Sequence, residues 1–121
     1  MEDRIVVLVV EDEAIIRMAL VSALEDAGFE VFDAQNADTA IDCLILNTNI
    51  QVVFTDIEMP GSIDGLKLAA AISDGWPPIK IIVTSGYHAI EPGTLPVEGL
   101  FLAKPYHTAD VVESIHQLMA A

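Results

Sequence analysis

The chain has 121 residues and a formal net charge of −14, and 53% of its residues are hydrophobic, which indicates one folded domain and excludes a disordered acidic protein. The five basic residues are scattered and Cys43 is the single cysteine, which excludes a basic stripe for DNA or RNA and an internal disulfide. The sequence shows neither a secretory signal nor a membrane span, so we expect a soluble, cytoplasmic protein.

Apolar runs in alternation with helical periodicity predict five strands, each followed by a helix or loop. The predicted strands are, in chain order, 4–10, 29–32, 52–56, 79–85 and 100–102. The first predicted helix covers about 13–27, and the second begins after the cap residue Asn36. The third covers about 64–74, and the last begins near Thr108. Two prolines and three glycines in 86–99 argue against a full helix there. This alternation predicts an α/β fold with helices on both faces of a parallel sheet.

Helical periodicity also predicts which side chains of the helices point inward. They are Ile16, Leu20, Ala23, Leu24 and Ala27 in the first helix, Ala37, Ile41, Leu44 and Ile45 in the second, and Val111, Ile115, Leu118 and Met119 in the last. The first helix carries further apolar residues, because Ile15, Ile16 and Met18 are too many to bury on one side. We therefore expect an exposed apolar patch that a partner helix bundle could use.

Two of the predicted strands end on carboxylates. The run Val52–Thr55 leads into Asp56, and the first strand leads into Glu11-Asp12-Glu13. In an open α/β sheet, ligands bind outside the carboxyl ends of the strands. Carboxylates gathered at one such edge repel each other unless a cation lies between them. The sequence therefore predicts a divalent metal with oxygen ligands at this edge.

Six short motifs stand in order on the strand ends and the loops that follow them. They are Glu11-Asp12, Asp56, Met59-Pro60, Asp64-Gly65, Ser85-Gly86 and Lys104-Pro105. With these motifs the chain, from about Ile5 to Leu118, resembles the receiver domain of bacterial two-component response regulators. The resemblance implies a flavodoxin-like (βα)5 fold, doubly wound around a five-stranded parallel sheet of strand order 2-1-3-4-5. It also implies that Asp56 accepts a phosphoryl group from the phosphohistidine of a histidine kinase.

The resemblance gives each polar residue type a role. Asp56 is the nucleophile that becomes an aspartyl phosphate. Mg²⁺ is held by Asp12, Asp56 and the backbone carbonyl of Glu58, and Glu11 assists through water. Lys104 supplies a flexible point charge for a phosphoryl oxygen. Such a chain is a signalling phosphoacceptor that promotes its own phosphorylation and dephosphorylation, and not an enzyme in the ordinary sense.

A hydroxyl at the end of the fourth strand completes this set, and two neighbours compete for the role. Thr84 and Ser85 point to opposite faces of a strand, so only one can reach the phosphoryl group. We assign Ser85, because Gly86 after it matches the small residue that follows the switch hydroxyl in the family, and Thr84 remains the alternative. Phe101 stands where the family has a switch aromatic, and the resemblance suggests a cis peptide bond at Lys104-Pro105.

Departures from the common receiver pattern point to a subclass. The loop 56–65 is one residue longer than usual, and Thr84-Ser85-Gly86-Tyr87 resembles the Phe-Ala-Thr-Gly-Tyr-type motif of stand-alone receivers. This implies a short or irregular helix after the fourth strand, and a single receiver domain over 1–121 with no output domain. It also implies a kinase of the HWE or a related type, or a phosphotransfer protein, as partner of a monomer or weak dimer. The expected docking residues are Ile15, Ile16, Met18, Pro105 and Tyr106.

Two other function classes share parts of this pattern. An Mg-dependent phosphatase that works through an aspartyl phosphate needs a second acid two residues after the nucleophile, and Glu58 stands there. A flavodoxin-like cofactor-binding module needs a phosphate-binding loop after the first strand. Glu11-Asp12-Glu13 at that position would repel a phosphate, which counts against the cofactor-binding module. In the phosphoacceptor class, output passes through protein–protein contacts with a downstream target or through phosphate relay.

Overall fold

The computed structural model describes residues 4–57, 65–85 and 99–120. Its strands are β1 (Val6–Val10), β2 (Glu30–Ala34), β3 (Val52–Asp56), β4 (Lys80–Ser85) and β5 (Leu100–Ala103). Its helices are α1 (Ala14–Asp26), α2 (Ala37–Leu46), α3 (Gly65–Gly75) and α4 (Thr108–Ala120). All strand pairs are parallel and the order is β2-β1-β3-β4-β5. The expected flavodoxin-like fold is confirmed.

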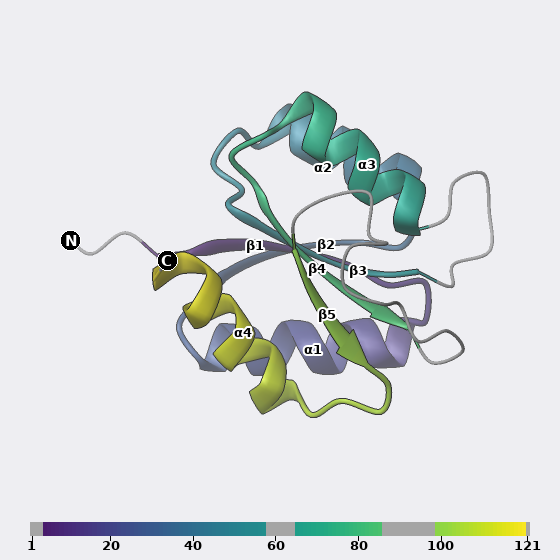
Figure 1. Ribbon diagram of the computed structural model, residues 1–121. Helices are drawn as coiled ribbons and strands as arrows, with labels where there is room; N and C mark the ends of the chain where they lie inside the picture. Colours follow the sequence, from purple (N-terminus) through teal and green to yellow (C-terminus); the bar gives the residue numbers. More distant parts are fainter. Residues whose placement is uncertain (1–3, 58–64, 86–98, 121) are drawn as a thin grey trace.

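The helices cover the sheet in two pairs, with α2 and α3 on one face and α1 and α4 on the other (Figure 1). Successive residues of a strand point to opposite faces, so the strands divide the core into two clusters. On the α2 and α3 face the core includes Leu8, Val10, Leu44, Val53, Leu68 and Ile72, and on the other face Val7, Val9, Leu20, Leu24, Phe54 and Ile115. Because both faces are covered, β1 is a continuous apolar run and β3 is apolar over its first three residues.

The observed edge strand and helix faces differ from the sequence prediction in particular places. β2 begins one residue later than predicted and continues to Ala34, because its pairing with β1 carries on through the polar Asp33. Two predicted inward positions, Ile16 of α1 and its C-cap residue Ala27, are exposed. In α2 Ile45 is 61% exposed.

The second helix shows why these inward positions were wrong. The buried stripe of α2 consists of Ala37, Ala40 and Leu44. Ile45 follows Leu44 by one position, about 100° around the helix, and therefore lies beside this stripe and not in it. The start of α2 agrees with the prediction, because Asn36 accepts a hydrogen bond from the Thr39 N–H in a capping box.

Two predicted features fall outside the described residues. They are the irregular helix expected between β4 and β5, in 86–98, and the loop 58–64 with Glu58 and its backbone carbonyl. Within 4–57, 65–85 and 99–120, no helix has the length and apolar character needed to span a bilayer.

Candidate functional site

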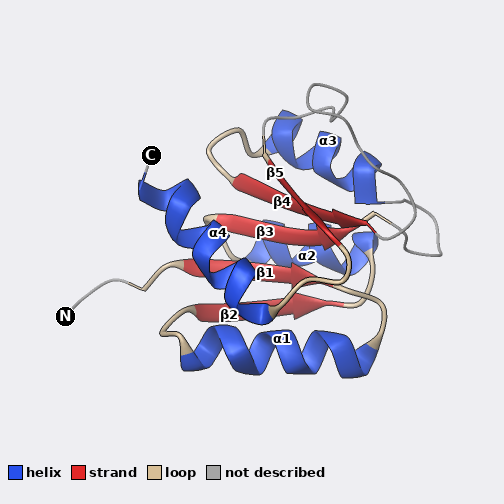
Figure 2. Cartoon of the chain, turned by 60° about the horizontal axis from the view of Figure 1, so that its bottom comes forward, coloured by secondary structure: helices blue, strands red, loops and turns tan. Residues whose placement is uncertain are grey.

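The carboxyl ends of β1, β3, β4 and β5 meet at one edge of the sheet (Figure 2). One carboxylate oxygen each from Glu11, Asp12 and Asp56 lies within 4.8 Å of the others. Glu11 and Asp56 are almost fully buried, with 1% and 2% of their surface exposed, and Asp12 is half-buried. The structure thus brings together the three acidic side chains that the sequence pointed to.

The carboxyl group of Glu11 shows the electrostatic cost of this arrangement. Its Oε2 accepts a hydrogen bond of 3.0 Å from the Glu13 N–H, but its buried Oε1 has no partner among the described residues. Burial, the neighbouring Asp12 carboxyl group and the negative charge of Asp56 raise the pKa of Glu11 from 4.5 to about 7, against the Glu13 hydrogen bond, which lowers it. An unpaired oxygen in a set of hard oxygen donors fits a small divalent cation such as Mg²⁺.

Lys104 supplies the positive charge of the site. Its Nζ donates to Asp56 Oδ2 at 2.5 Å, and its side chain is 31% exposed against 3% for Asp56. The backbone places it there, because the Lys104 N–H donates to the Ser85 carbonyl at 3.0 Å. The Lys104–Pro105 peptide bond is cis, as the resemblance suggested. The ammonium group therefore contacts the Asp56 carboxylate in the unphosphorylated protein.

The two competing hydroxyls of β4 have different surroundings. Thr84 is the pairing partner of Asp56 on β3, so both side chains point to the α1 and α4 face. The buried Thr84 Oγ1 has no hydrogen-bond partner in the described part of the chain. Ser85 is buried at the last position of β4, opposite Ala103 of β5. Alternation thus turns Thr84, and not Ser85, to the face of Asp56, so the assignment of Ser85 as the switch hydroxyl stays a prediction that rests on the family pattern.

Phe101, the predicted switch aromatic, pairs with Val83 across β4 and β5. It is half-buried and packs against the core cluster on the α2 and α3 face. This is also the face to which alternation directs the side chain of Ser85, since Val83 belongs to the same cluster. The shared face is consistent with a coupling between the two residues, and the switch role of Phe101 stays a prediction.

A groove of about 560 Å³ leads from the acidic edge onto the surface of α1. It is lined by Glu11, Ile15, Ile16, Ala19, Leu20, Lys104, Pro105, Tyr106 and Thr108. Four of the five predicted docking residues are in this lining, and the fifth, Met18, is 66% exposed on α1. Tyr106 packs edge-on against Phe54, with ring centroids 5.5 Å apart. Burial raises the pKa of Tyr106, and the negative charge of Glu11 raises it further.

Gly65, the first residue of α3, lies directly against the backbone of Asp56. Its N–H donates to the Ile57 carbonyl at 3.2 Å, and a Cβ at this position would overlap the carbonyl oxygen of Asp56. Only glycine allows this approach. The Asp64-Gly65 motif marked the position in the sequence, but nothing in the sequence showed which backbone the glycine meets.

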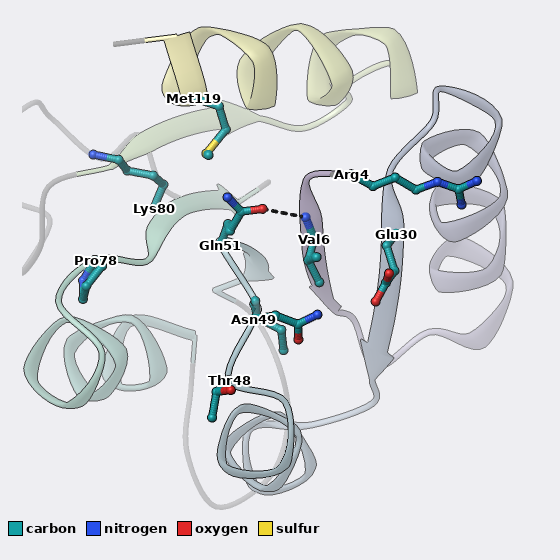
Figure 3. Close-up of a pocket in the computed structure, with 10 residues that line it drawn as sticks. Arg4, Val6, Glu30, Thr48, Asn49, Gln51, Pro78, Lys80 and Met119 are labelled. Carbon is teal, nitrogen blue, oxygen red and sulfur yellow. Dashed lines mark hydrogen bonds between the residues drawn. The ribbon is translucent and has the colours of Figure 1, made fainter. Parts of the chain in front are cut away.

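A second cleft, of about 620 Å³, lies at the opposite, amino end of the strands (Figure 3). The Gln51 side chain closes onto β1 there, because its Oε1 accepts a hydrogen bond of 3.1 Å from the Val6 N–H. The side chains of Arg4 and Lys80 extend away from each other (Figure 3). Since these two charges do not converge, the carboxyl edge is the candidate site.

Comparison with known proteins gives a consistent result. A family model described as the response regulator receiver domain matches residues 7–116. The response regulator receiver protein CpdR of Brucella abortus (strain 2308) is 32% identical over 118 residues, with 95% of this chain and 97% of CpdR covered. The sensor kinase CckA of the same organism is 31% identical over 117 residues, which are 93% of this chain and 12% of the kinase.

Solved structures resemble the whole fold. A response regulator receiver protein from Sinorhizobium medicae WSM419 superposes with a TM-score of 0.89 at 31% identity and covers 98% of this chain and 97% of its own. The response regulator protein TrrA of Thermotoga maritima, solved in complex with Mg²⁺–BeF, has a TM-score of 0.82 at 29% identity. That match covers 94% of this chain and 98% of TrrA.

Proposed function

The chain belongs to the response regulator receiver family, and from this premise we propose that Asp56 accepts a phosphoryl group from a histidine kinase phosphohistidine. The observation that carries the proposal is the surroundings of the Asp56 carboxylate. It is buried, it contacts the Lys104 ammonium group at 2.5 Å, and it lies within reach of Glu11 and Asp12. A nucleophile, a compensating cation and a set of hard oxygen ligands are the parts that phosphoryl transfer needs.

We assign Mg²⁺ as the cofactor, held by Asp12 and Asp56, with Glu11 acting through water and the Glu58 carbonyl, which lies outside the described residues, as a further ligand. The unpaired Oε1 of Glu11 and the three close carboxylates support this set. When bound, the divalent ion neutralises charge on the transferring phosphoryl group. The Mg²⁺–BeF complex of TrrA agrees with this assignment.

In the transfer step a carboxylate oxygen of Asp56 forms a bond to phosphorus as the phosphorus–nitrogen bond of the donor breaks. The imidazole of the donor takes the electron pair of that bond. Asp56 is held in place at the end of a buried strand, which preserves its orientation for the attack. Lys104 is partly exposed and flexible, so its ammonium can follow the negative charge from the carboxylate to a phosphoryl oxygen. The hydroxyl of Ser85 donates to another oxygen of the product.

The groove beside the site is the proposed docking surface for the phosphodonor. Ile15 is 84% exposed on the first turn of α1, and Pro105 and Tyr106 form the opposite side. An apolar surface that ends at the phosphoacceptor fits a helix bundle that presents a phosphohistidine. We propose a histidine kinase of the HWE or a related type, or a phosphotransfer protein, as this partner, and a downstream protein as the receiver of the signal.

Incubation with Mg²⁺ and acetyl phosphate, followed by mass spectrometry of the intact protein and its peptides, tests the proposal. We expect one phosphoryl group, labile in alkali, on the peptide that contains Asp56, and none when Mg²⁺ is chelated. Asp56→Asn should abolish the modification because it removes the nucleophile and keeps the shape. The matched control is Asp33→Asn, which changes a half-exposed carboxylate on β2. Equal modification of Asp56→Asn would refute the assignment.

A further inference from the structure

Arg17, in the first turn of α1, joins the helix to the ends of two strands. Its Nη1 donates to the backbone carbonyl of Glu11 at 2.8 Å, and its Nε donates to Asp33 Oδ2 at 3.0 Å. The Arg17 side chain is 16% exposed, and that of Asp33 is 50% exposed. One guanidinium group thus contacts the turn after β1 and the end of β2 at the same time.

The contact with Glu11 is one of three hydrogen bonds that hold this residue, two at its backbone and one at its side chain. The Glu11 N–H donates to the Ala34 carbonyl at 3.1 Å, and Glu11 Oε2 accepts from the Glu13 N–H at 3.0 Å. Arg17 supplies the third contact, to the carbonyl. That carbonyl belongs to the peptide group shared with Asp12, so its orientation sets the direction from which the Asp12 side chain leaves the backbone.

The start of α1 has no capping side chain that would fix this turn. The N-cap residue of α1, Glu13, makes no side-chain hydrogen bond to the first turn. The side chain of Arg17 therefore holds the turn that contains Glu11 and Asp12, through its hydrogen bond to the Glu11 carbonyl. A lysine could not replace it, because an ammonium group lacks the fork of donors that reaches a carbonyl and a carboxylate together.

We propose that Arg17 is a positioning residue of the metal site, which holds the Glu11–Asp12 peptide so that both carboxylates meet Asp56. The inference deepens the proposed function and rests on its metal site. A positioning role and a simple charge effect predict opposite results. Loss of a nearby positive charge alone would strengthen binding of a cation. Loss of a support for the ligands weakens it, typically by 10-fold or more at metal sites.

To test this, the metal-free full chain is titrated with Mg²⁺, and binding is monitored through the amide resonances in NMR spectra. We expect Arg17→Gln to weaken Mg²⁺ binding by about 10-fold and Arg17→Lys to weaken it less. Asp33→Asn is the matched control, since it removes a partly exposed ion pair but leaves the carbonyl contact, and we expect little change in affinity. The Asp12 amide nitrogen, which is bonded to the Glu11 carbonyl carbon, should shift in both Arg17 variants without metal, and not in Asp33→Asn.

Unchanged or tighter Mg²⁺ binding by Arg17→Gln would overturn the inference, and so would wild-type affinity in Arg17→Lys. If Arg17→Gln does not fold, the lysine variant and the Asp12 resonance decide the question. A failure of the wild-type chain to bind Mg²⁺ would instead overturn the proposed metal site. The two proposals therefore fail in distinguishable ways.

Discussion

The raised pKa of Glu11 makes the stability of the metal-free protein depend on pH. The folded protein keeps a proton on Glu11 up to about pH 7, whereas a glutamate in the unfolded chain loses it near pH 4.5. Between these values the folded state binds the additional proton, so the free energy of unfolding falls as pH rises. The difference of about 2.5 pKa units, 7 minus 4.5, corresponds to a loss of about 3 kcal/mol once both states are ionised.

Glu11→Gln should remove this loss, because a glutamine keeps an oxygen for the Glu13 N–H and carries no charge. In urea unfolding with a chelator, we expect the variant to exceed the wild type by about 3 kcal/mol at pH 8 and by less than about 1 kcal/mol at pH 5. Saturating Mg²⁺ should reduce or reverse the gap, since the wild type binds the ion more tightly. The control, Glu13→Gln, changes an exposed neighbour. The same stability gap at both pH values would refute the reasoning.

Four further substitutions test other contacts of the site. Lys104→Ala removes the cation nearest the phosphoacceptor, so Mg²⁺ binding should be retained or become tighter, and weaker binding in a titration would contradict this. Thr84→Val replaces a buried hydroxyl that lacks a partner among the described residues and should stabilise the fold by about 1 kcal/mol. Ser85→Ala should reduce the phosphorylation-induced change in NMR spectra, and a larger effect at Thr84 would mean that the other hydroxyl is the switch. Gly65→Ala should cost about 1–3 kcal/mol in thermal unfolding and slow phosphorylation. Gly75→Ala, where a Cβ meets open space, should do neither.

The buried strands were the most predictable part of the molecule. β1 and β3 are apolar on both faces, so their limits are visible as abrupt changes from valine and phenylalanine to carboxylates. The parallel sheet then brings Glu11 and Asp56 together, because β1 and β3 are neighbours that point the same way, as the strand order implied by the resemblance requires. Half-buried β2 gave a poorer signal, since Asp33 interrupts its apolar pattern but not its pairing with β1.

Contacts made to the backbone by residues distant in the sequence were not predictable. Arg17 reaches the Glu11 carbonyl, and Gly65 meets the Asp56 backbone, through the folded geometry of a turn and a helix start. Periodicity describes which face of an element is apolar and carries no information on such contacts. The same limit applies to Ile45, because periodicity alone did not show that the buried stripe of α2 is centred on Ala37, Ala40 and Leu44.

The hydrogen bond between Gly65 and Ile57 has a consequence for how the chain tolerates changes in length. It fastens the two ends of the segment 58–64 to each other, next to Asp56. The entropy of closing such a loop depends weakly on its length, and adding one residue to six costs about 0.1 kcal/mol. A change of one residue in the length of this segment therefore costs little closure entropy, while the Gly65–Ile57 hydrogen bond keeps both anchor points beside Asp56.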